Sequence, residues 1–417
     1  MAIDSPPKNI VIIGGGIIGS TSAYFLSQHP AYDPANTTIT ILEASQIAGG
    51  ASGKAGGLLG LWAYPSCIVP LSFRLHKELA DKHNGAERWG YRGVHCGQIE
   101  MKGRPVAKGK GAPTTERSGD SVSLQKRTKE ALGQLRAAGV PKDLDWVVPE
   151  GVRSYDAMGD PDDTAQVHPY QFTTSMAKLA EEKGVRVVYG SVTDIKTSGD
   201  NVEAVSYAPK DGGETQTIPA DKVVISAGPW TRDVFPIAPI SATRAHSVVI
   251  KPTRPVSNYA LFTSIELPSS NGSSKGGSRG AVSETVAPEI YARPGQEVYA
   301  CGEGDRLVPL PKTSDEVEVD EQRSQDVIDY VSTISDELQD GEIVAKQACY
   351  LPNVSRGSGG PIIGELSSIR GVVMAAGHTC WGIQNGPGTG KLVSEIVWDG
   401  KAKSANISSL SPAKWGL

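Results

Sequence analysis

Three glycines with the spacing Gly14-x-Gly16-x-x-Gly19 form a pattern that suits the binding of a dinucleotide through its phosphates. Gly14 would form a tight turn, Gly16 would let the backbone approach a pyrophosphate, and Gly19 would let a helix pack closely on a strand. Backbone N–H groups and the helix dipole would then hold the phosphates. Glu43 stands where a carboxylate can bind ribose hydroxyl groups. We therefore predict a bound adenine dinucleotide, with a purely structural glycine turn as the alternative.

The elements around these residues are those that a dinucleotide site needs. Residues 9–13 are an apolar run that predicts a buried parallel strand, and residues 17–28 read as a helix. Residues 38–42 predict a second buried strand that ends at Glu43, which completes a β-α-β unit. An acid at the ribose position disfavours NADP, because it would repel the 2′-phosphate. The pattern leaves NAD and FAD open.

Composition excludes several other classes of protein. The 417 residues are 39% hydrophobic and 21% charged, which excludes disorder along the whole chain. The formal net charge of −5 gives no electrostatic reason to expect nucleic acid as a partner. The five cysteines form no CxxC pair, so we expect neither a zinc ribbon nor any other metal site.

The sequence has no recognisable targeting or membrane segment. No run of about 18 apolar residues occurs, so we expect no membrane span. The first residues lack the basic, apolar and small-residue order of a signal peptide. We therefore expect a cytoplasmic protein.

The rest of the chain predicts an α/β protein with two domains. A two-residue period typical of half-buried strands occurs at residues 247–251, 289–293 and 297–301, and a final helix is expected at 389–398. We predict a Rossmann-like domain that binds the dinucleotide, with an inserted α+β substrate domain built on an antiparallel sheet. The predicted ranges are 1–90, 150–235 and 345–417 for the first domain, and 91–149 and 236–344 for the second.

Two polar segments interrupt this pattern. Residues 102–121 are rich in Gly, Lys, Pro and Ser, and residues 268–280 are rich in Gly and Ser. Both read as surface loops, which would suit the binding of a protein partner.

Several motifs, in order along almost the whole chain, resemble those of the D-amino-acid-oxidase-type flavoproteins, a group that includes glycine, sarcosine and fructosyl-amino-acid oxidases. They are residues 11–19 (VIIGGGIIG), 42–44 (LEA), 50–57 (GASGKAGG), 223–230 (VVISAGPW), 290–294 (IYARP), 361–364 (PIIG) and 376–391 (AGHTCWGIQNGPGTGK). With Cys349-Tyr-Leu-Pro352, residues 52–57 are most similar to a fungal and plant subgroup of FAD oxidoreductases. One yeast member of that subgroup is linked to endosome-to-Golgi transport.

The resemblance implies FAD as the cofactor, bound in an extended form with its isoalloxazine ring between the two domains. Residues 50–57 would run along the flavin. Residues 386–390 would precede a helix whose N-terminus faces the pyrimidine carbonyl of the flavin. The residues assigned to FAD binding are Gly14, Gly16, Ile17, Ile18, Gly19, Glu43, Ala44, Ser52, Lys54, Ala55, Gly56, Gly57, Val192, Ala227, Gly228, Trp230, Gly377, His378, Trp381, Gly382, Ile383 and Gln384.

Four residues are candidates for catalytic roles in such an enzyme. Lys54 would place a cation near the reactive edge of the flavin, where negative charge develops; the alternative is a surface lysine. Arg293 would bind a substrate carboxylate, with Tyr291 on the same strand face as a further donor; the alternative is a surface ion pair. Trp381 would form a wall of the flavin site, or else pack in the core.

Cys349 bears on how the flavin is attached. Some members of the family link a cysteine covalently to the flavin within a Cys-x-Tyr pattern. Here Ala348 stands two residues before Tyr350, and the cysteine is displaced by one position. We therefore expect non-covalent FAD and a buried free thiol at Cys349.

These features predict an oxidoreductase that acts on the C–N bond of an amino acid or amine. Hydride would pass to the flavin N5 atom, and the electrons would then pass to oxygen. Two alternatives remain open, namely an FAD dehydrogenase with another acceptor and a flavin-bound scaffold in intracellular protein transport. An NAD-dependent dehydrogenase is disfavoured by the motif at residues 377–391.

Overall fold

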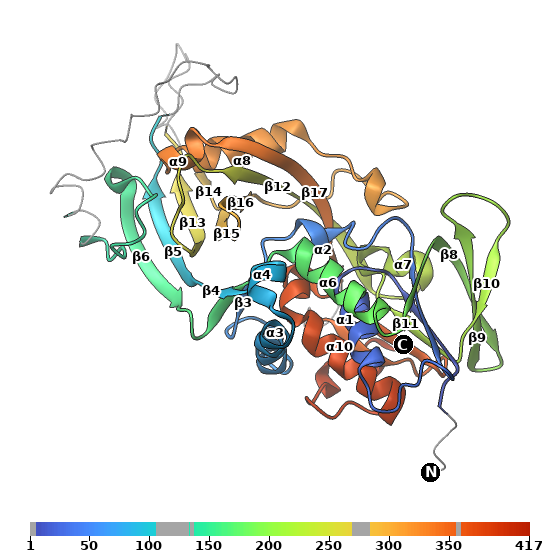
Figure 1. Cartoon of the computed structure of the whole chain (residues 1–417). Coiled ribbons are helices and arrows are strands. Elements are labelled where there is room, and N and C mark those ends of the chain that lie inside the picture. The colour runs from blue at the N-terminus through green and yellow to red at the C-terminus, as the bar shows by residue number, and fades with distance from the viewer. Residues whose placement is uncertain (1–5, 106–132, 134–136, 269–283, 356–359) are drawn as a thin grey trace.

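The first of two large sheets contains the predicted β-α-β unit. The structure, a computed structural model, describes residues 6–105, 133, 137–268, 284–355 and 360–417 (Figure 1). The strand order of this sheet is β10-β9-β8-β2-β1-β11-β19-β18. The strands are β1 (Asn9–Ile13), β2 (Thr38–Glu43), β8 (Arg186–Ser198), β9 (Asn201–Pro209), β10 (Gln216–Pro219), β11 (Lys222–Ile225), β18 (Ile362–Glu365) and β19 (Val372–Ala376).

The central strands of this sheet run parallel, in the order β8, β2, β1, β11 and β19. Their sequences are nearly continuous apolar runs, as in NIVII for β1 and VVMAA for β19. Such runs are typical of strands buried on both faces. The antiparallel strands β9, β10 and β18 extend the two edges.

Helices cover the first sheet and form its main apolar core. Helix α1 packs against both α10 and α6, and the core around it includes Ile12, Tyr24 and Phe172. The helices described in this part of the chain are α1 (Ile17–Ser27), α2 (Ala51–Lys54), α3 (Val69–His83), α4 (Gly85–Trp89), α6 (Pro169–Glu181), α7 (Thr231–Val234) and α10 (Gly382–Asp399).

The second large sheet has the order β17-β12-β16-β15-β13-β5-β6, with β14 paired to β13. It is antiparallel apart from the β13–β5 pair. Its strands are β5 (His95–Lys102), β6 (Val152–Gly159), β12 (Ile240–Lys251), β13 (Tyr259–Glu266), β14 (Thr285–Val286), β15 (Glu289–Arg293), β16 (Glu297–Cys301) and β17 (Glu342–Val354). The helices α8 (Glu321–Ser332) and α9 (Asp336–Gln339) lie between β16 and β17 in the chain. In Figure 1 this sheet lies above the helices of the first unit.

Three short strands form a third, small sheet. They are β3 (Leu58–Gly60), β7 (Thr164–Gln166) and β4 (Arg92–Gly93), in the order β3-β7-β4. Short 3-10 helices complete the described structure. They are η2 (Pro149–Gly151), η3 (Gly228–Trp230), η4 (Ser314–Glu316), η5 (Thr379–Trp381), η6 (Ser408–Leu410) and η7 (Pro412–Trp415).

The last helix begins earlier than the sequence predicts. We expected it at residues 389–398, with residues 386–390 before the helix, whereas α10 spans Gly382–Asp399. The expected start was wrong because Gly386 and Gly390 lie inside the helix, where they permit close packing against α1. A Cβ at Gly390 would come within 2.5 Å of the backbone carbon of Thr21 in α1.

The sheets suggest a revision of the predicted domain ranges. Strands β6 and β17 belong to the second sheet, although the ranges that start at 150 and 345 assign nearly all of their residues to the first domain. We propose that the second domain extends to Gly159 and to Val354 at these two boundaries. The segments 102–121 and 268–280 fall almost entirely outside the described residues. In the described part of the chain, no helix is both long and apolar enough to cross a membrane.

Candidate functional site

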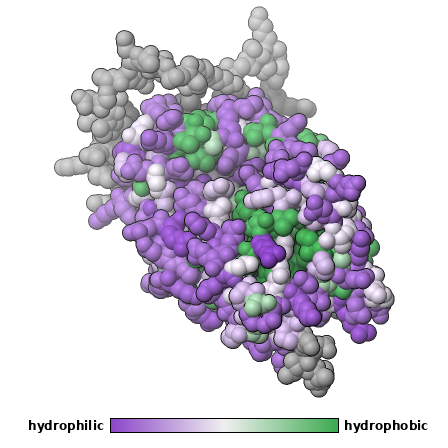
Figure 2. Space-filling model, turned by 45° about the vertical axis from the view of Figure 1, so that its right-hand side comes forward, coloured by the Kyte–Doolittle hydropathy of each residue, from purple (hydrophilic) through white to green (hydrophobic). Residues whose placement is uncertain are grey.

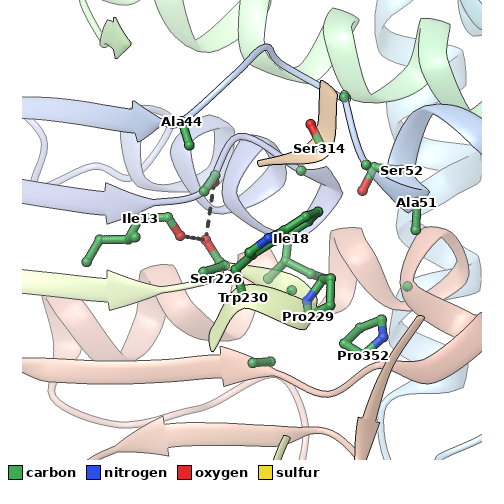
Figure 3. A pocket seen from close by; sticks show the side chains of 18 of the residues that line it. Ile13, Ile18, Ala44, Ala51, Ser52, Ser226, Pro229, Trp230, Ser314 and Pro352 are labelled. Carbon is green, nitrogen blue, oxygen red and sulfur yellow. Dashed lines mark hydrogen bonds between the residues drawn. The ribbon is translucent and has the colours of Figure 1, made fainter. Parts of the chain in front are cut away.

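A cavity opens at the carboxyl ends of β1, β2, β11 and β19. It contains about 1280 Å³ free of protein atoms, part of which is open to solvent. Ligands of open parallel sheets bind at this end of the strands. Its lining is rich in Gly, Ala and Ile, and Figure 3 shows side chains from several separate segments around it. Apolar residues also gather near the middle of one face of the molecule, within mostly hydrophilic surroundings (Figure 2).

The glycine turn has the geometry that a phosphate-binding turn requires. Gly14 has a φ of +102°, and a Cβ there would lie 2.6 Å from the carbonyl oxygen of Ser226. A Cβ at Gly19 would overlap the carbonyl oxygen of Gly14, so only glycine lets α1 approach β1 this closely. The Ser226 hydroxyl donates to the Ile13 carbonyl at 2.9 Å and joins β11 to this turn (Figure 3).

Ser52 is part of the same turn. Its Oγ accepts a hydrogen bond from the backbone N–H of Ile17 at 2.9 Å, and it lies 3.0 Å from where a Cβ on Gly16 would stand. A side chain at Gly16 would therefore fill the space between the turn and α2. The backbone leaves room there for a ligand's phosphates.

Glu43 is held at the edge of the cavity by backbone donors. One carboxylate oxygen accepts from the Gly15 N–H at 2.7 Å and the other from the Ser45 N–H at 2.8 Å. Each carboxylate oxygen can accept more than one hydrogen bond, so ribose hydroxyls could still bind.

Residues 54–57 link the two large sheets. The Nζ atom of Lys54 donates to the carbonyl oxygen of Ala348 in β17 at 3.0 Å, and burial lowers the Lys54 pKa. A Cβ at Gly56 would overlap the ring of Tyr291, and Gly57 has a φ of +88°. The small residues in this segment therefore permit direct contact with the second sheet.

Arg293 binds this segment from the second sheet. Its Nε donates to the Gly56 carbonyl at 3.4 Å, and its Nη2 donates to the Ala55 carbonyl. The guanidinium lies 4.7 Å from the centre of the Tyr299 ring. The side chain is buried, and no carboxylate of the described residues forms an ion pair with it. Its Nη1 atom has no hydrogen-bond partner among the described residues, so the predicted role in binding a carboxylate stays a prediction.

A row of aromatic rings extends from this point, and we call it the aromatic wall. Neighbouring ring centres are 5.5–6.1 Å apart, which suits edge-to-face and stacked pairs. Its members, in order of contact, are Tyr64, Trp381, Trp62, Phe262, Tyr291 and Tyr299. Trp381 therefore contacts other aromatic side chains and does not line the main cavity.

One carboxyl group lies beside Tyr291 of the aromatic wall. Glu289 accepts a hydrogen bond from the hydroxyl of Tyr291, and the thiol of Cys301 lies 3.9 Å away. Burial raises the pKa of Glu289. The strand face of β15 thus presents Glu289, Tyr291 and Arg293 in succession.

His378 lies inside the cavity wall as a neutral group. Burial lowers its pKa to about 3, and its Nε2 lies 3.0 Å from the hydroxyl of Thr389. The neighbouring Gln384 is buried and accepts from the Gly60 N–H at 2.9 Å. Helix α10 begins at Gly382, which lines the cavity, so its N-terminus faces this space.

Most residues predicted to bind FAD line the cavity. They are Gly14, Gly16, Ile17, Ile18, Glu43, Ala44, Ser52, Ala55, Val192, Ala227, Gly228, Trp230, Gly377, His378, Gly382 and Ile383. Eight predicted residues lie behind or beside the lining, namely Gly19, Lys54, Gly56, Gly57, Tyr291, Arg293, Trp381 and Gln384. Cys349 is buried, burial raises its pKa to about 11, and it does not line the cavity, although Leu351 and Pro352 do.

Sequence reasoning missed several lining residues. Lys312, Thr313 and Ser314 come from a segment after β16 that carries no recognised motif. Thr379 and Cys380 occupy the variable positions of the motif at 376–391. The sequence held no signal for the first group, because their place depends on how the second sheet folds over the first.

The sequence is similar to that of known FAD-dependent oxidoreductases over almost the whole chain. A family model described as DAO, FAD dependent oxidoreductase, matches residues 9–396. The chain is 36% identical to TDA3 of Saccharomyces cerevisiae, an oxidoreductase by name, over 97% of this chain and 94% of that protein. It is 33% identical to the oxidoreductase C1F5.03c of Schizosaccharomyces pombe, over 98% of both chains.

Solved structures share the fold. The glycine oxidase of Geobacillus kaustophilus superposes with a TM-score of 0.67 at 19% identity, over 97% of this chain and 98% of that chain. The L-proline dehydrogenase of P. horikoshii superposes with a TM-score of 0.67 at 16% identity, over 99% and 98%.

Proposed function

Because the chain belongs to the DAO family of FAD-dependent oxidoreductases, we propose that it oxidises a C–N bond of an amino acid or amine, with oxygen as the acceptor. Its cofactor is FAD, and the glycine turn and cavity fit that group. When bound, FAD supplies the acceptor for a hydride from the carbon next to nitrogen. We propose that FAD binds non-covalently, since Cys349 does not line the cavity.

The observation that carries the proposal is the aromatic wall beside residues 54–57. Tyr291 packs on Gly56, next to Ala55 in the cavity lining, so the wall begins where the cavity meets the second sheet. A substrate held against such rings is shielded from water and oriented by shape. The names of similar folds, among them glycine oxidase, iminodiacetate oxidase and L-proline dehydrogenase, support the same bond class.

The charged side chain of Arg293, beside the aromatic wall, supports an amino acid as the substrate. Arg293 is a buried guanidinium with Nη1 available, and a carboxylate is the group that best matches it. Tyr291 shares its strand face and adds apolar surface. We therefore assign Arg293 both to holding residues 55–56 and to binding the substrate carboxylate.

Lys54 supplies a cation close to the flavin segment. Its ammonium is held by the Ala348 carbonyl, in a half-buried position where electrostatic effects are stronger than in water. A fixed cation there stabilises negative charge that develops during electron transfer to oxygen. His378 is neutral above about pH 3, so it does not supply such a charge.

The first experiment uses the purified holoenzyme, whose flavin is followed by absorbance before and after acid precipitation. Flavin released into the supernatant supports non-covalent binding, whereas flavin in the pellet contradicts it. The protein is then mixed without oxygen with a panel of amino acids and amines. Bleaching of the flavin by one class of amine, with peroxide formed on admission of air, supports the proposed reaction. Bleaching without peroxide points to a dehydrogenase with another acceptor.

Lys54→Met tests the role of the cation in the oxygen reaction. We expect the reduced enzyme to react with oxygen about 10- to 100-fold more slowly, because one preorganised charge is lost. The rate is measured by stopped-flow absorbance after reduction under nitrogen. Lys178→Met, at an exposed position of α6, is the matched control and is expected to keep the wild-type rate. Equal rates in both variants would contradict the assignment of Lys54.

A further inference from the structure

A segment from outside the Rossmann-like unit lines part of the cavity. Residues 308–316, which we call the strap, lie between β16 and α8 in the chain. Lys312, Thr313 and Ser314 of the strap line the cavity, although none belongs to a recognised dinucleotide motif. The cavity is thus bounded on one side by residues that come from outside the Rossmann-like unit.

Hydrogen bonds hold the strap along its length. The hydroxyl of Tyr350 donates to the carbonyl of Val308 at 3.1 Å and to that of Pro309 at 3.0 Å. The indole N–H of Trp230, itself in the cavity lining, donates to the Pro311 carbonyl at 2.7 Å. Two prolines in this stretch limit the freedom of the backbone.

The strap touches the ribose end of the dinucleotide site. The hydroxyl groups of Ser314 and Ser45 lie 2.5 Å apart, and Ser45 follows Glu43 by two positions and binds its carboxylate. A Cβ at Gly49 would come within 2.5 Å of the Ser314 hydroxyl, so residue 49 must be glycine for the strap to pack this closely. Figure 3 shows Ser314 on a segment of its own beside the segments of Ala44 and Ser52.

Lys312 adds charge to the rim. Its side chain is exposed and lines the cavity, and its ammonium forms no ion pair with the described residues. Its backbone N–H donates to the Glu316 carboxylate at 3.1 Å, which fixes the local turn. FAD carries an anionic pyrophosphate, which a free cation at the rim attracts.

The chain around the strap is fastened to the second sheet. The buried pair Arg244 and Asp305 is joined at 3.3 Å, and Arg323 of α8 lies 3.3 Å from the same carboxylate. On the other side the N–H of Asp320 donates to His246 of β12 at 3.0 Å. The strap is therefore tied to the second sheet on both sides.

We propose that the strap is part of the FAD-binding site and retains the adenosine half of the cofactor, so that the second domain controls FAD release as well as substrate binding. FAD leaves only when the Ser45–Ser314 and Trp230–Pro311 contacts open. The proposal rests on FAD binding and not on the substrate, so it can fail independently of the proposed reaction.

A reversible cross-link tests the strap directly. In a Ser45→Cys/Ser314→Cys variant the two side chains are close enough to form a disulfide. FAD release from the diluted holoenzyme is followed by the fluorescence of free FAD. We expect release to be at least about tenfold slower in the oxidised variant, and to become at least as fast as in the wild type on reduction.

The control is a disulfide of the same kind away from the cavity. Ser206→Cys/Thr217→Cys joins β9 and β10, where the two hydroxyl groups lie 3.1 Å apart, and is expected to leave FAD release unchanged. Equal release from the oxidised and reduced forms of the strap variant would overturn the proposal.

A second pair of variants keeps the test decisive if the cross-link does not form. Trp230→Phe keeps an aromatic ring but loses the N–H that binds Pro311, and is expected to release FAD about three- to tenfold faster. Trp398→Phe is the matched control, since its indole N–H donates to the Leu26 carbonyl at 3.2 Å, in the contact between α10 and α1. Identical release rates in the two variants would also overturn the proposal.

Discussion

Glu289 is a carboxyl group whose surroundings disfavour its charge. It lies beside the apolar cluster of Cys96, Ala260 and Tyr299, and its hydrogen bond comes from the hydroxyl of Tyr291. No lysine or arginine of the described residues forms an ion pair with it. Burial therefore raises its pKa even though the Tyr291 hydrogen bond acts in the opposite direction.

This residue makes the stability of the protein depend on pH. Because the pKa of Glu289 is raised, the folded protein holds this proton more tightly than the unfolded chain does. The contribution of this group to the free energy of unfolding then falls as the pH rises above 4.5, the ordinary pKa of a glutamate, and through the raised pKa. Glu289→Gln removes this dependence, so we expect the variant to gain stability relative to the wild type between about pH 5 and about pH 8.

Urea unfolding of wild type and variant at these two pH values measures the effect. Glu297→Gln, on the neighbouring strand β16, is the control and is expected to keep the wild-type dependence on pH. If Glu289→Gln and wild type differ equally at both pH values, Glu289 does not titrate in this range.

At the scale of elements, close packing of α1 against α10 supports the cavity. The hydroxyl of Thr21 donates to the Gly386 carbonyl at 2.8 Å, and Gly390 packs directly on the backbone of Thr21. A glycine in a helix interior costs about 1 kcal/mol relative to alanine. At these positions the cost is offset by a helix contact that no larger residue permits.

Gly390→Ala tests this packing. The new Cβ would meet the backbone of Thr21, which cannot move aside as a side chain could, so overpacking outweighs the gain in helix propensity. We expect the free energy of unfolding to fall by about 1–3 kcal/mol in urea titrations.

Gly382→Ala in the same helix is the control. Its Cβ would meet only side-chain atoms at 3.8 Å, an ordinary contact distance, so we expect a change within about 1 kcal/mol. Equal losses of stability in the two variants would show that the α1–α10 contact does not limit the side chain at Gly390.

At the scale of the whole molecule, residues 54–57 join the two large sheets. Lys54 bonds to β17, and Arg293 of β15 bonds to the carbonyls of Ala55 and Gly56. The strap makes a separate connection, through Ser45 and Trp230. The cofactor site is therefore bounded by both sheets.

Arg293→Ala is expected to loosen this connection. Hydrogen bonds from a charged donor contribute about 1.5–3 kcal/mol, so we expect a loss of about 2–3 kcal/mol in the free energy of unfolding. Arg232→Ala, at an exposed position of α7, is expected to change it by less than about 0.5 kcal/mol. Similar losses in both variants would contradict the role of Arg293 in joining the sheets.

The comparisons confirm the family, the FAD cofactor and the α/β fold that the motifs predicted. Local sequence was sufficient here, because each motif encodes a backbone requirement. Gly14 needs a positive φ, and Gly19 needs the absence of a Cβ, whatever the rest of the chain does. The predicted start of α10 was wrong because glycines such as Gly386 and Gly390, which disfavour a helix locally, here allow the helix to pack closely on α1.

The dinucleotide-binding unit and its order along the chain follow from the sequence alone, because glycine spacing and apolar strands act over short distances. In contrast, the contacts of Arg293 with the carbonyls of Ala55 and Gly56, and of Ser314 with Ser45, depend on the tertiary fold. These contacts join residues more than 200 positions apart, and no local pattern of residue types specifies them. They exist because two distinct sheets meet at one cavity, and the shape of both surfaces determines which side chains meet.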